Sequence, residues 1–121
     1  MWISKVLLNN SFQNKAEKAN ITISNENSVC ANGSCEVRNI PVYSPYGIES
    51  HPISEADVLL IPCYDGYAIC GCKNKASSQI NSGELRLFSM GGASIILKNN
   101  GDIVLNRLII KKDGTMVRQE D

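Results

Sequence analysis

The sequence has little of what most enzymes and charged-ligand proteins need. It contains one histidine, His51, which excludes a three-histidine metal site and an HExxH helix. No G-x-S-x-G motif and no phosphate-binding loop are present. A pairing of His51 with Cys63 stays open, although nothing in the sequence marks either side chain as activated. We therefore predict a protein that is not an enzyme and holds no metal or cofactor.

Net charge and long apolar runs are also missing. Twelve basic residues balance twelve acidic ones, which argues against binding that depends on neutralising nucleic-acid phosphates or an anionic membrane. No apolar run approaches the roughly 18 residues of a membrane span. The apolar part of residues 1–10 is too short for a signal peptide. We expect synthesis and folding in a cytoplasm, as one domain or one domain with a small appendage.

Five cysteines are present, an odd number in a chain without an expected export signal. Disulfides are disfavoured in a reducing compartment. Cys30 and Cys35 flank a turn-like stretch and are expected to face each other, and Cys70 and Cys72 share one face of a strand. A zinc site assembled from these two pairs stays an alternative, although their spacing matches that of zinc ligands poorly. The preferred interpretation is that all five are small buried apolar residues.

Residues 1–80 contain short apolar runs separated by turn residues, with little sign of helix. Residues 9–20 are polar and are predicted as a loop, with at most a helical turn at 15–18. Two prolines make residues 39–47 an edge strand that runs into a loop. The continuous apolar run of residues 57–61 predicts a strand buried on both faces. The other expected strands are residues 2–8, 21–23, 29–30, 35–38 and 67–72.

This spacing of strands fits a small closed barrel or sandwich, and the five-stranded OB type is the economical choice. Asn32 and Gly33 predict one hairpin turn, and Asp65 and Gly66 predict another. Residues 73–82 are polar and aperiodic, and are predicted to connect the barrel to the C-terminal part.

The C-terminal part repeats with an offset of thirteen residues, because residues 95–104 (IILKNNGDIV) align with residues 108–117 (LIIKKDGTMV). Each unit is a strand, a turn that begins with lysine, and a second strand. Gly101 and Gly114 supply the positive φ that tight hairpins require.

Apolar residues alternate along these strands. Ile95, Leu97, Ile103 and Leu105 fall on one face, and the second unit repeats the pattern with Leu108, Ile110 and Met116. A free hairpin of this length is marginal in water, so the face needs a partner. Self-association through this face is attractive. The alternative is that the strands fold back onto the barrel and form one larger sandwich.

Three segments, taken in order, resemble the Mu-type baseplate assembly proteins, the protein V or central spike family of contractile-tailed phages and related injection particles. The first is residues 36–52 (EVRNIPVYSPYGIESHP), followed by the expected strand at 56–61 and a strand that ends near Gly71. The second is residues 83–89 (GELRLFS), and the third is residues 92–103 (GASIILKNNGDI). The resemblance covers residues 36–106, and the order of the segments is more specific than any one of them.

The resemblance implies an all-β chain, with an OB-type barrel over residues 1–80 and an intertwined homotrimeric β-prism or β-helix over residues 81–121. It also implies a structural role in a virion or injection particle, at the centre of the tail baseplate, between the tail hub protein and the puncturing tip, in transient contact with the target-cell envelope. Synthesis would take place in the cytoplasm of the bacterial host, and no nucleic acid is an expected partner. The residues expected to fill the trimer interior are Ile95, Leu97, Ile103, Leu105, Ile110 and Met116.

The chain departs from some relatives in this family. It has no histidine after His51 for an iron site at the spike apex, and no room for a lysozyme domain. The C-terminal part is short, so we expect a separate protein to cap the tip. The alternative function is a monomeric OB-type module that binds oligosaccharide or another polymer through its tyrosines, which are Tyr43, Tyr46, Tyr64 and Tyr67.

Overall fold

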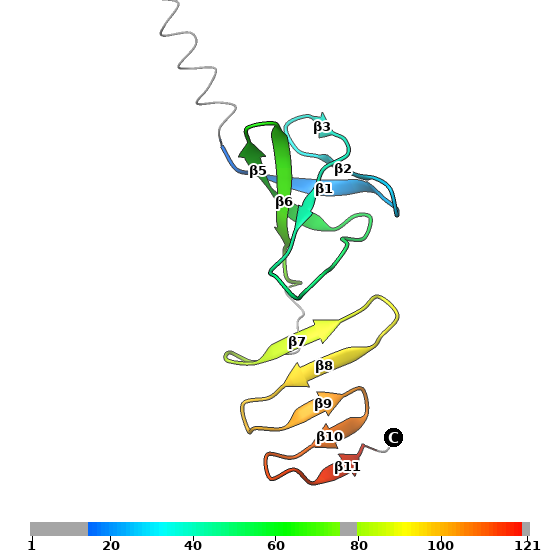
Figure 1. Cartoon of the computed structure of the whole chain (residues 1–121), viewed down its shortest axis with the longest axis vertical. Helices are drawn as coiled ribbons and strands as arrows, with labels where there is room; N and C mark the ends of the chain where they lie inside the picture. Colours follow the sequence, from blue (N-terminus) through cyan, green and yellow to red (C-terminus); the bar gives the residue numbers. More distant parts are fainter. Residues whose placement is uncertain (1–14, 76–79, 120–121) are drawn as a thin grey trace, which may run out of the picture. The chain divides into compact units, whose positions relative to one another are not determined.

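The computed structural model describes residues 15–75 and 80–119 (Figure 1). The described residues form eleven strands in two sheets and no helix, which confirms the predicted all-β class. The chain divides into two compact units, residues 1–75 and residues 76–121. No strand of one sheet pairs with a strand of the other. The strand expected at residues 2–8 lies outside the described residues.

The N-terminal unit is a six-stranded sheet with the order β3-β2-β1-β5-β6-β4 (Figure 1). Five strand pairings make up this sheet. Four of them are antiparallel, and only β4 runs parallel to its neighbour, β6. The strands are β1 Glu17–Ser24, β2 Val29–Asn32, β3 Glu36–Val37, β4 Val42–Tyr43, β5 Asp57–Cys63 and β6 Gly66–Cys72.

One face of this sheet carries the core of the N-terminal unit. Its largest fully buried side chains are Ile21, Leu60 and Ile69, from β1, β5 and β6. The other buried members of the same cluster are Ala19, Val29, Ala31, Ile40 and Val58. Val37, Val42, Ala56 and Tyr67 pack against this cluster and are partly buried.

The strands do not close into the predicted barrel. Residues 40 and 41 approach both β2 and β6, because the Ile40 amide donates to the Val29 carbonyl and the Pro41 carbonyl accepts from Ile69, each at 2.9 Å. Pro41 has no N–H group to extend either ladder. β4 is therefore only two residues long and pairs with β6 alone, which leaves the sheet open.

Two further predictions for this unit are wrong. β1 begins at Glu17 rather than Ile21, because residues 17–20 pair with β5 in spite of their polar sequence. β5 is not buried on both faces: Val58 and Leu60 are buried, whereas Leu59 and Ile61 are 40% and 36% exposed. A continuous apolar run does not reveal whether a second layer covers the other face, and none of the described residues buries it.

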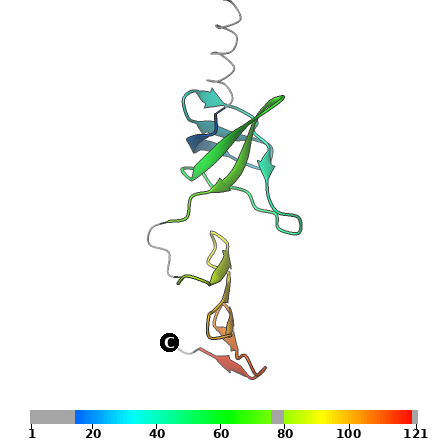
Figure 2. The same ribbon diagram turned by 90° about the vertical axis from the view of Figure 1, so that its left-hand side faces the viewer.

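The C-terminal unit is a five-stranded antiparallel meander in which each strand pairs with the next one in the chain. Figure 2 views these strands closer to edge-on, and they form a single layer. The strands are β7 Leu85–Phe88, β8 Ser94–Leu97, β9 Ile103–Leu105, β10 Leu108–Ile110 and β11 Met116–Arg118.

Three of the four hairpin turns in this meander share one geometry. In each five-residue loop the first amide donates to the last carbonyl, and the fourth residue is a glycine whose amide donates to the first carbonyl. These glycines are Gly92, Gly101 and Gly114, with φ of 96°, 94° and 91°. Left-handed backbone of this kind is accessible to glycine at little cost, so these residues fix where the chain reverses.

Candidate functional site

The strand register places apolar side chains in two rows across one face of the C-terminal sheet. Directly paired residues lie on the same face, and so do residues two apart on one strand. The first row is Leu85, Leu97, Ile103, Ile110 and Met116, and the second is Leu87, Ile95, Leu105, Leu108 and Arg118. We call these ten residues the wide face. Nine of them are apolar.

The wide face has no core of its own. Ile103 is 37% exposed, Leu97 is 42% exposed and Met116 is 68% exposed. Among residues 80–119 the only buried apolar side chain is Val104, which lies on the opposite face. A single-layered sheet with one buried apolar residue needs a further surface to cover its apolar side.

The opposite face carries a single apolar row. It crosses the five strands as Arg86, Ile96, Val104, Ile109 and Val117. Phe88 lies beside this row and is covered on one side by the Arg86 guanidinium. The other residues that flank the row along the strands are polar, among them Ser94, Lys98, Asp102, Lys111 and Thr115. The aliphatic stems of lysine can cover a narrow apolar row while their charges stay in water. This contrast marks the wide face as the side of the sheet that requires a partner.

The six residues predicted for a trimer interior all lie on the wide face. The register brings Leu97, Ile103, Ile110 and Met116 into one row and Ile95 and Leu105 into the other. Whether they line a trimer stays a prediction. The sequence analysis left three further members, Leu85, Leu87 and Leu108, out of its interior set. The alternation of leucines in residues 85–87 was the signal for two of them, and it lies outside the thirteen-residue repeat.

Gly101 and Gly114 sit at equivalent points of two turns, but their surroundings differ. A Cβ atom on Gly101 would lie 2.8–2.9 Å from three carbons of the Lys112 side chain, whereas one on Gly114 would meet nothing within 4 Å. Asn100 and Asp113 precede these glycines, and each accepts a hydrogen bond of 2.9 Å from the backbone amide two residues later.

Polar contacts connect the turns at one end of the strands. The two carboxylate oxygens of Glu84 accept from the Asn81 amide at 2.9 Å and the Asn99 amide at 3.1 Å. These bonds, to Asn81 first and Asn99 second, hold the pKa of Glu84 below its ordinary value. Lys111 pairs with Asp102 at 3.5 Å, between the next two turns. The turns are therefore ordered relative to one another.

Hydrogen bonds from Thr115 likewise lower the pKa of Asp113. The side-chain hydroxyl of Thr115 contributes most, followed by its backbone amide. Because these bonds are local, they order the β10–β11 turn.

Arg86 opens the apolar row of the opposite face. Its guanidinium lies over the Phe88 ring, 4.6 Å from the ring centroid. Its Nε atom is buried and has no hydrogen-bond partner among the described residues. Arg86, Glu84 and Lys98 border a small pocket of about 350 Å³. Glu84 already accepts two backbone hydrogen bonds here, so the pocket does not offer a clean site for an anion.

In the N-terminal unit the side chains of His51 and Cys63 are not hydrogen-bonded to each other, and each contacts a different backbone carbonyl. His51 Nε2 lies 2.9 Å from the Asn25 carbonyl, and the Cys63 thiol contacts the Ile61 carbonyl at 3.7 Å. Glu55 and Asp57 are tied to one side chain, since the Asn20 amide donates to the Glu55 carbonyl and the Asp57 carboxylate. These contacts describe an anchored loop rather than an activated nucleophile.

An open groove of about 830 Å³ lies between the β1–β2 loop and residues 39–51. Its lining includes Glu26, Asn39, Tyr46 and His51. Of the four tyrosines only Tyr46 borders this groove, and its side chain is fully exposed. Tyr67 packs against the core instead. This groove is therefore bordered by one tyrosine rather than by several.

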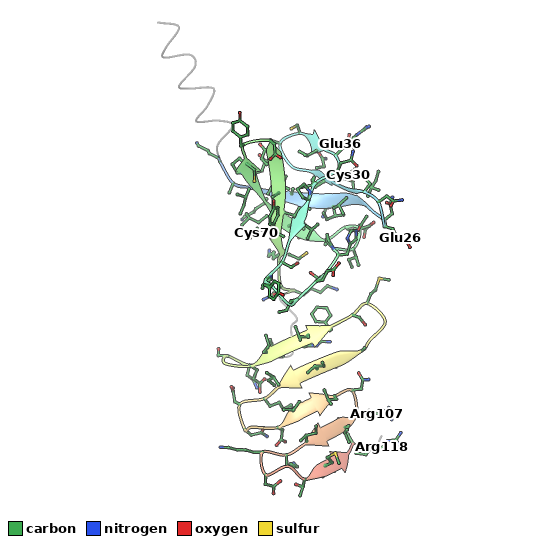
Figure 3. The ribbon with its side chains drawn as sticks, in the orientation of Figure 1. Glu26, Cys30, Glu36, Cys70, Arg107 and Arg118 are labelled. Atoms are coloured by element: carbon green, nitrogen blue, oxygen red, sulfur yellow. The ribbon has the colours of Figure 1, made fainter. Side chains whose placement is uncertain are left out.

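The cysteine predictions are largely wrong. All five are free; Cys30 is buried, and the other four, Cys35, Cys63, Cys70 and Cys72, are exposed. Figure 3 shows Cys30 on β2 and Cys70 on β6. Cys30 and Cys35 do not face each other, because the register pairs Asn32 with Glu36 and places Cys35 at the turn beside Gly33. Although Cys72 is exposed, neighbouring atoms remove part of the hydration of its thiol, and this desolvation raises its pKa. Across residues 15–75 and 80–119 no three His, Cys, Asp or Glu side chains are grouped to hold a metal ion.

The chain was compared with protein-family models, curated proteins and solved structures, and none gives a significant match. In the part of the chain that the structure describes, no helix has the length and apolar character needed to cross a membrane. Function is therefore inferred from the geometry of the two sheets and from the resemblance over residues 36–106.

Proposed function

We propose that this chain is a structural subunit of the central spike of a contractile phage tail or related injection particle. Three copies would assemble through their wide faces into a β-prism, and the trimer would link the tail hub protein to the puncturing tip. The observation that carries the proposal is the wide face itself: nine apolar side chains on a single-layered sheet whose only buried apolar residue lies on the other side.

The energetics favour self-association. Six of the nine apolar side chains are between 37% and 68% exposed, and covering each would contribute about 1 kcal/mol. The total is comparable with the stability of a whole small domain, about 5–15 kcal/mol. Because the wide face is apolar apart from Arg118, it is complementary to further copies of itself.

The proposed role is mechanical. In an interlocked β-structure the edges of each sheet are protected by neighbouring copies, so force along the axis does not peel single strands away. The three turns with glycine at the fourth position fix where the strands of each sheet reverse direction, and the proposed β-prism depends on these reversals. An enzymatic site has no part in this role. A separate tip-capping protein and contact with the target-cell envelope belong to the same proposal.

The decisive experiment is the solution mass of the purified chain by light scattering coupled to size exclusion. Three copies of 13.2 kDa give about 40 kDa. A mass of one chain would mean that the wide face is covered within the chain. A monomeric oligosaccharide-binding module with the groove beside Tyr46 would then be the better candidate, and a glycan-binding screen would be the next measurement.

A charge on the wide face provides the matched test. Leu97→Asp would bring three unpaired carboxylates together in an apolar interior, so we expect monomers or aggregates. Val117→Asp is the control, because Val117 lies on the opposite face and is 47% exposed. It should remain trimeric. A soluble Leu97→Asp trimer with unchanged melting temperature would contradict the assignment of the interior.

A further inference from the structure

Arg118 occupies an apolar position of the C-terminal repeat. The thirteen-residue offset aligns Leu105 with Arg118, while the other aligned pairs on the wide face are apolar in both units. Those pairs are Ile95 with Leu108, Leu97 with Ile110, and Ile103 with Met116. The strand register independently places Arg118 on the wide face. Arg118 pairs with Leu108 and is the last residue of the row that begins at Leu87.

No group within residues 15–75 or 80–119 neutralises Arg118: it makes no hydrogen bond and no ion pair with any of them. Of the three carboxylates among residues 80–119, Asp102 pairs with Lys111, Asp113 accepts hydrogen bonds from Thr115, and Glu84 accepts hydrogen bonds from two backbone amides. Arg107 lies at the same end of the sheet and adds a second positive charge there (Figure 3). Arg118 is exposed.

Trimer formation would change the surroundings of Arg118. If three wide faces meet, three Arg118 side chains approach one another at the end of an apolar interior. A guanidinium does not lose its proton at ordinary pH, so burial cannot be relieved by deprotonation. Repulsion and lost hydration must be offset by a negative group. Each guanidinium offers several N–H donors in a planar fork that suits phosphate and carboxylate oxygens.

We propose that the three Arg118 guanidiniums of the trimer bind one anionic group of phosphate or carboxylate type. This inference rests on the proposed trimer. The other basic residues near this end do not provide such a site: Lys111 is paired with Asp102, and Lys112 lies in a turn rather than on the wide face. The anion would either come from solution or be a carboxylate of the tip-capping protein.

The stoichiometry of anion binding tests the proposal. The full-length trimer is titrated with sodium phosphate by calorimetry at constant ionic strength, and we expect one phosphate bound per three chains. Sodium acetate, titrated separately, tests whether a lone carboxylate binds at the same ratio and competes with phosphate. Phosphate should raise the melting temperature of the trimer by about 2–4 °C near saturation.

Two variants separate this site from general surface charge. Arg118→Met restores an apolar residue at the repeat position, so the trimer should persist while phosphate binding and the melting shift are lost. Lys112→Met removes one charge from the same hairpin but outside the wide face, and should bind phosphate like the unaltered chain. A further variant, Glu120→Gln with Asp121→Asn, removes the carboxylates that follow Arg118 in the sequence and should also retain binding.

The possible failures are distinguishable. A trimer that binds one phosphate per chain, binds none, or binds equally well as Arg118→Met overturns the anion site and leaves the proposed function standing. Binding that appears only after Glu120 and Asp121 are replaced overturns it too, because the counter-charge would then belong to the chain. A monomer in light scattering overturns the trimer and this inference together.

Discussion

Single residues decide where the C-terminal strands reverse and which side of the sheet is apolar. Gly92, Gly101 and Gly114 adopt the same left-handed backbone at the same point of three turns. The sequence repeat identified two of these turns. The third turn, at Gly92, lies outside the repeat, because Gly92 precedes Gly101 by nine residues rather than thirteen. Consecutive turns of a meander lie at opposite ends of its strands, so the number of residues between two turns depends on the lengths of the strands and loops between them. Turns of the same geometry can therefore be unequally spaced along the chain.

The two repeat glycines should differ in their tolerance of alanine. Gly114→Ala adds only the left-handed strain of a residue with a Cβ atom, about 1–2 kcal/mol. Gly101→Ala should cost more, because its Cβ would also lie within 3 Å of the Lys112 side chain. Thermal unfolding of both variants measures the difference. Equal losses would show that Lys112 moves aside freely.

Glu84 makes the C-terminal unit sensitive to acid. Its pKa is lowered in the folded state, so its contribution to stability is complete above the ordinary carboxyl pKa, about 4.3. The contribution is lost as pH falls through the lower, folded-state value. We expect Glu84→Gln to lower the melting temperature at pH 7 and to differ less from the unaltered chain below about pH 4. A gap that stays constant with pH would mean that the carboxylate charge contributes nothing.

At the scale of elements, β5 shows that the burial of a strand's residues depends on whether a second layer covers each face of the sheet. Its sequence is almost continuously apolar, yet only alternate residues are buried, because one face of the N-terminal sheet carries the core. β1 shows the reverse case: polar residues 17–20 form a strand because β5 offers them a hydrogen-bonded partner. Local preference is overridden in both elements by the neighbouring strand or layer.

Two adjacent leucines test this alternation in β5. Leu60 is fully buried and Leu59 is 40% exposed. Leu60→Ala should destabilise the N-terminal unit by about 2–5 kcal/mol, and Leu59→Ala by well under half as much. Hydrogen exchange of amides in residues 15–75, measured in the full chain, reports the loss for this unit. Similar losses for both variants would indicate that a second layer covers Leu59.

At the scale of the whole molecule, the two units differ in how complete they are. The N-terminal unit buries eight residues in one cluster, whereas the C-terminal unit buries Val104 alone among residues 80–119. A unit with its own core can be stable without a partner. A single-layered sheet with a wide apolar face needs a further surface to cover that face.

This difference predicts two responses to dilution. If the C-terminal sheets assemble with one another, their unfolding temperature should rise with protein concentration. The N-terminal unit should unfold at a temperature that varies much less. Calorimetric scans over a hundredfold range of concentration, with hydrogen exchange to assign the transitions, measure both. A C-terminal transition that is independent of concentration would indicate that its apolar face is covered within one chain.

The sequence by itself determined the features that depend on local chemistry. These are the all-β class, the glycine turns, the edge position of the proline-bearing strand and the alternation that places Ile95, Leu97, Ile103 and Leu105 on one face. Turn preferences and the period of two act over a few residues, so they can be read without knowing the fold.

The tertiary structure decided what depends on pairing between distant residues. It added Leu85 and Leu87 to the wide face and set Arg118 at the end of a leucine row, because register across strands is a relation between segments. It left the N-terminal sheet open, since Pro41 has no amide to complete a ladder. It also exposed four cysteines, because the burial of a small apolar residue follows from the layer above it rather than from its own chemistry.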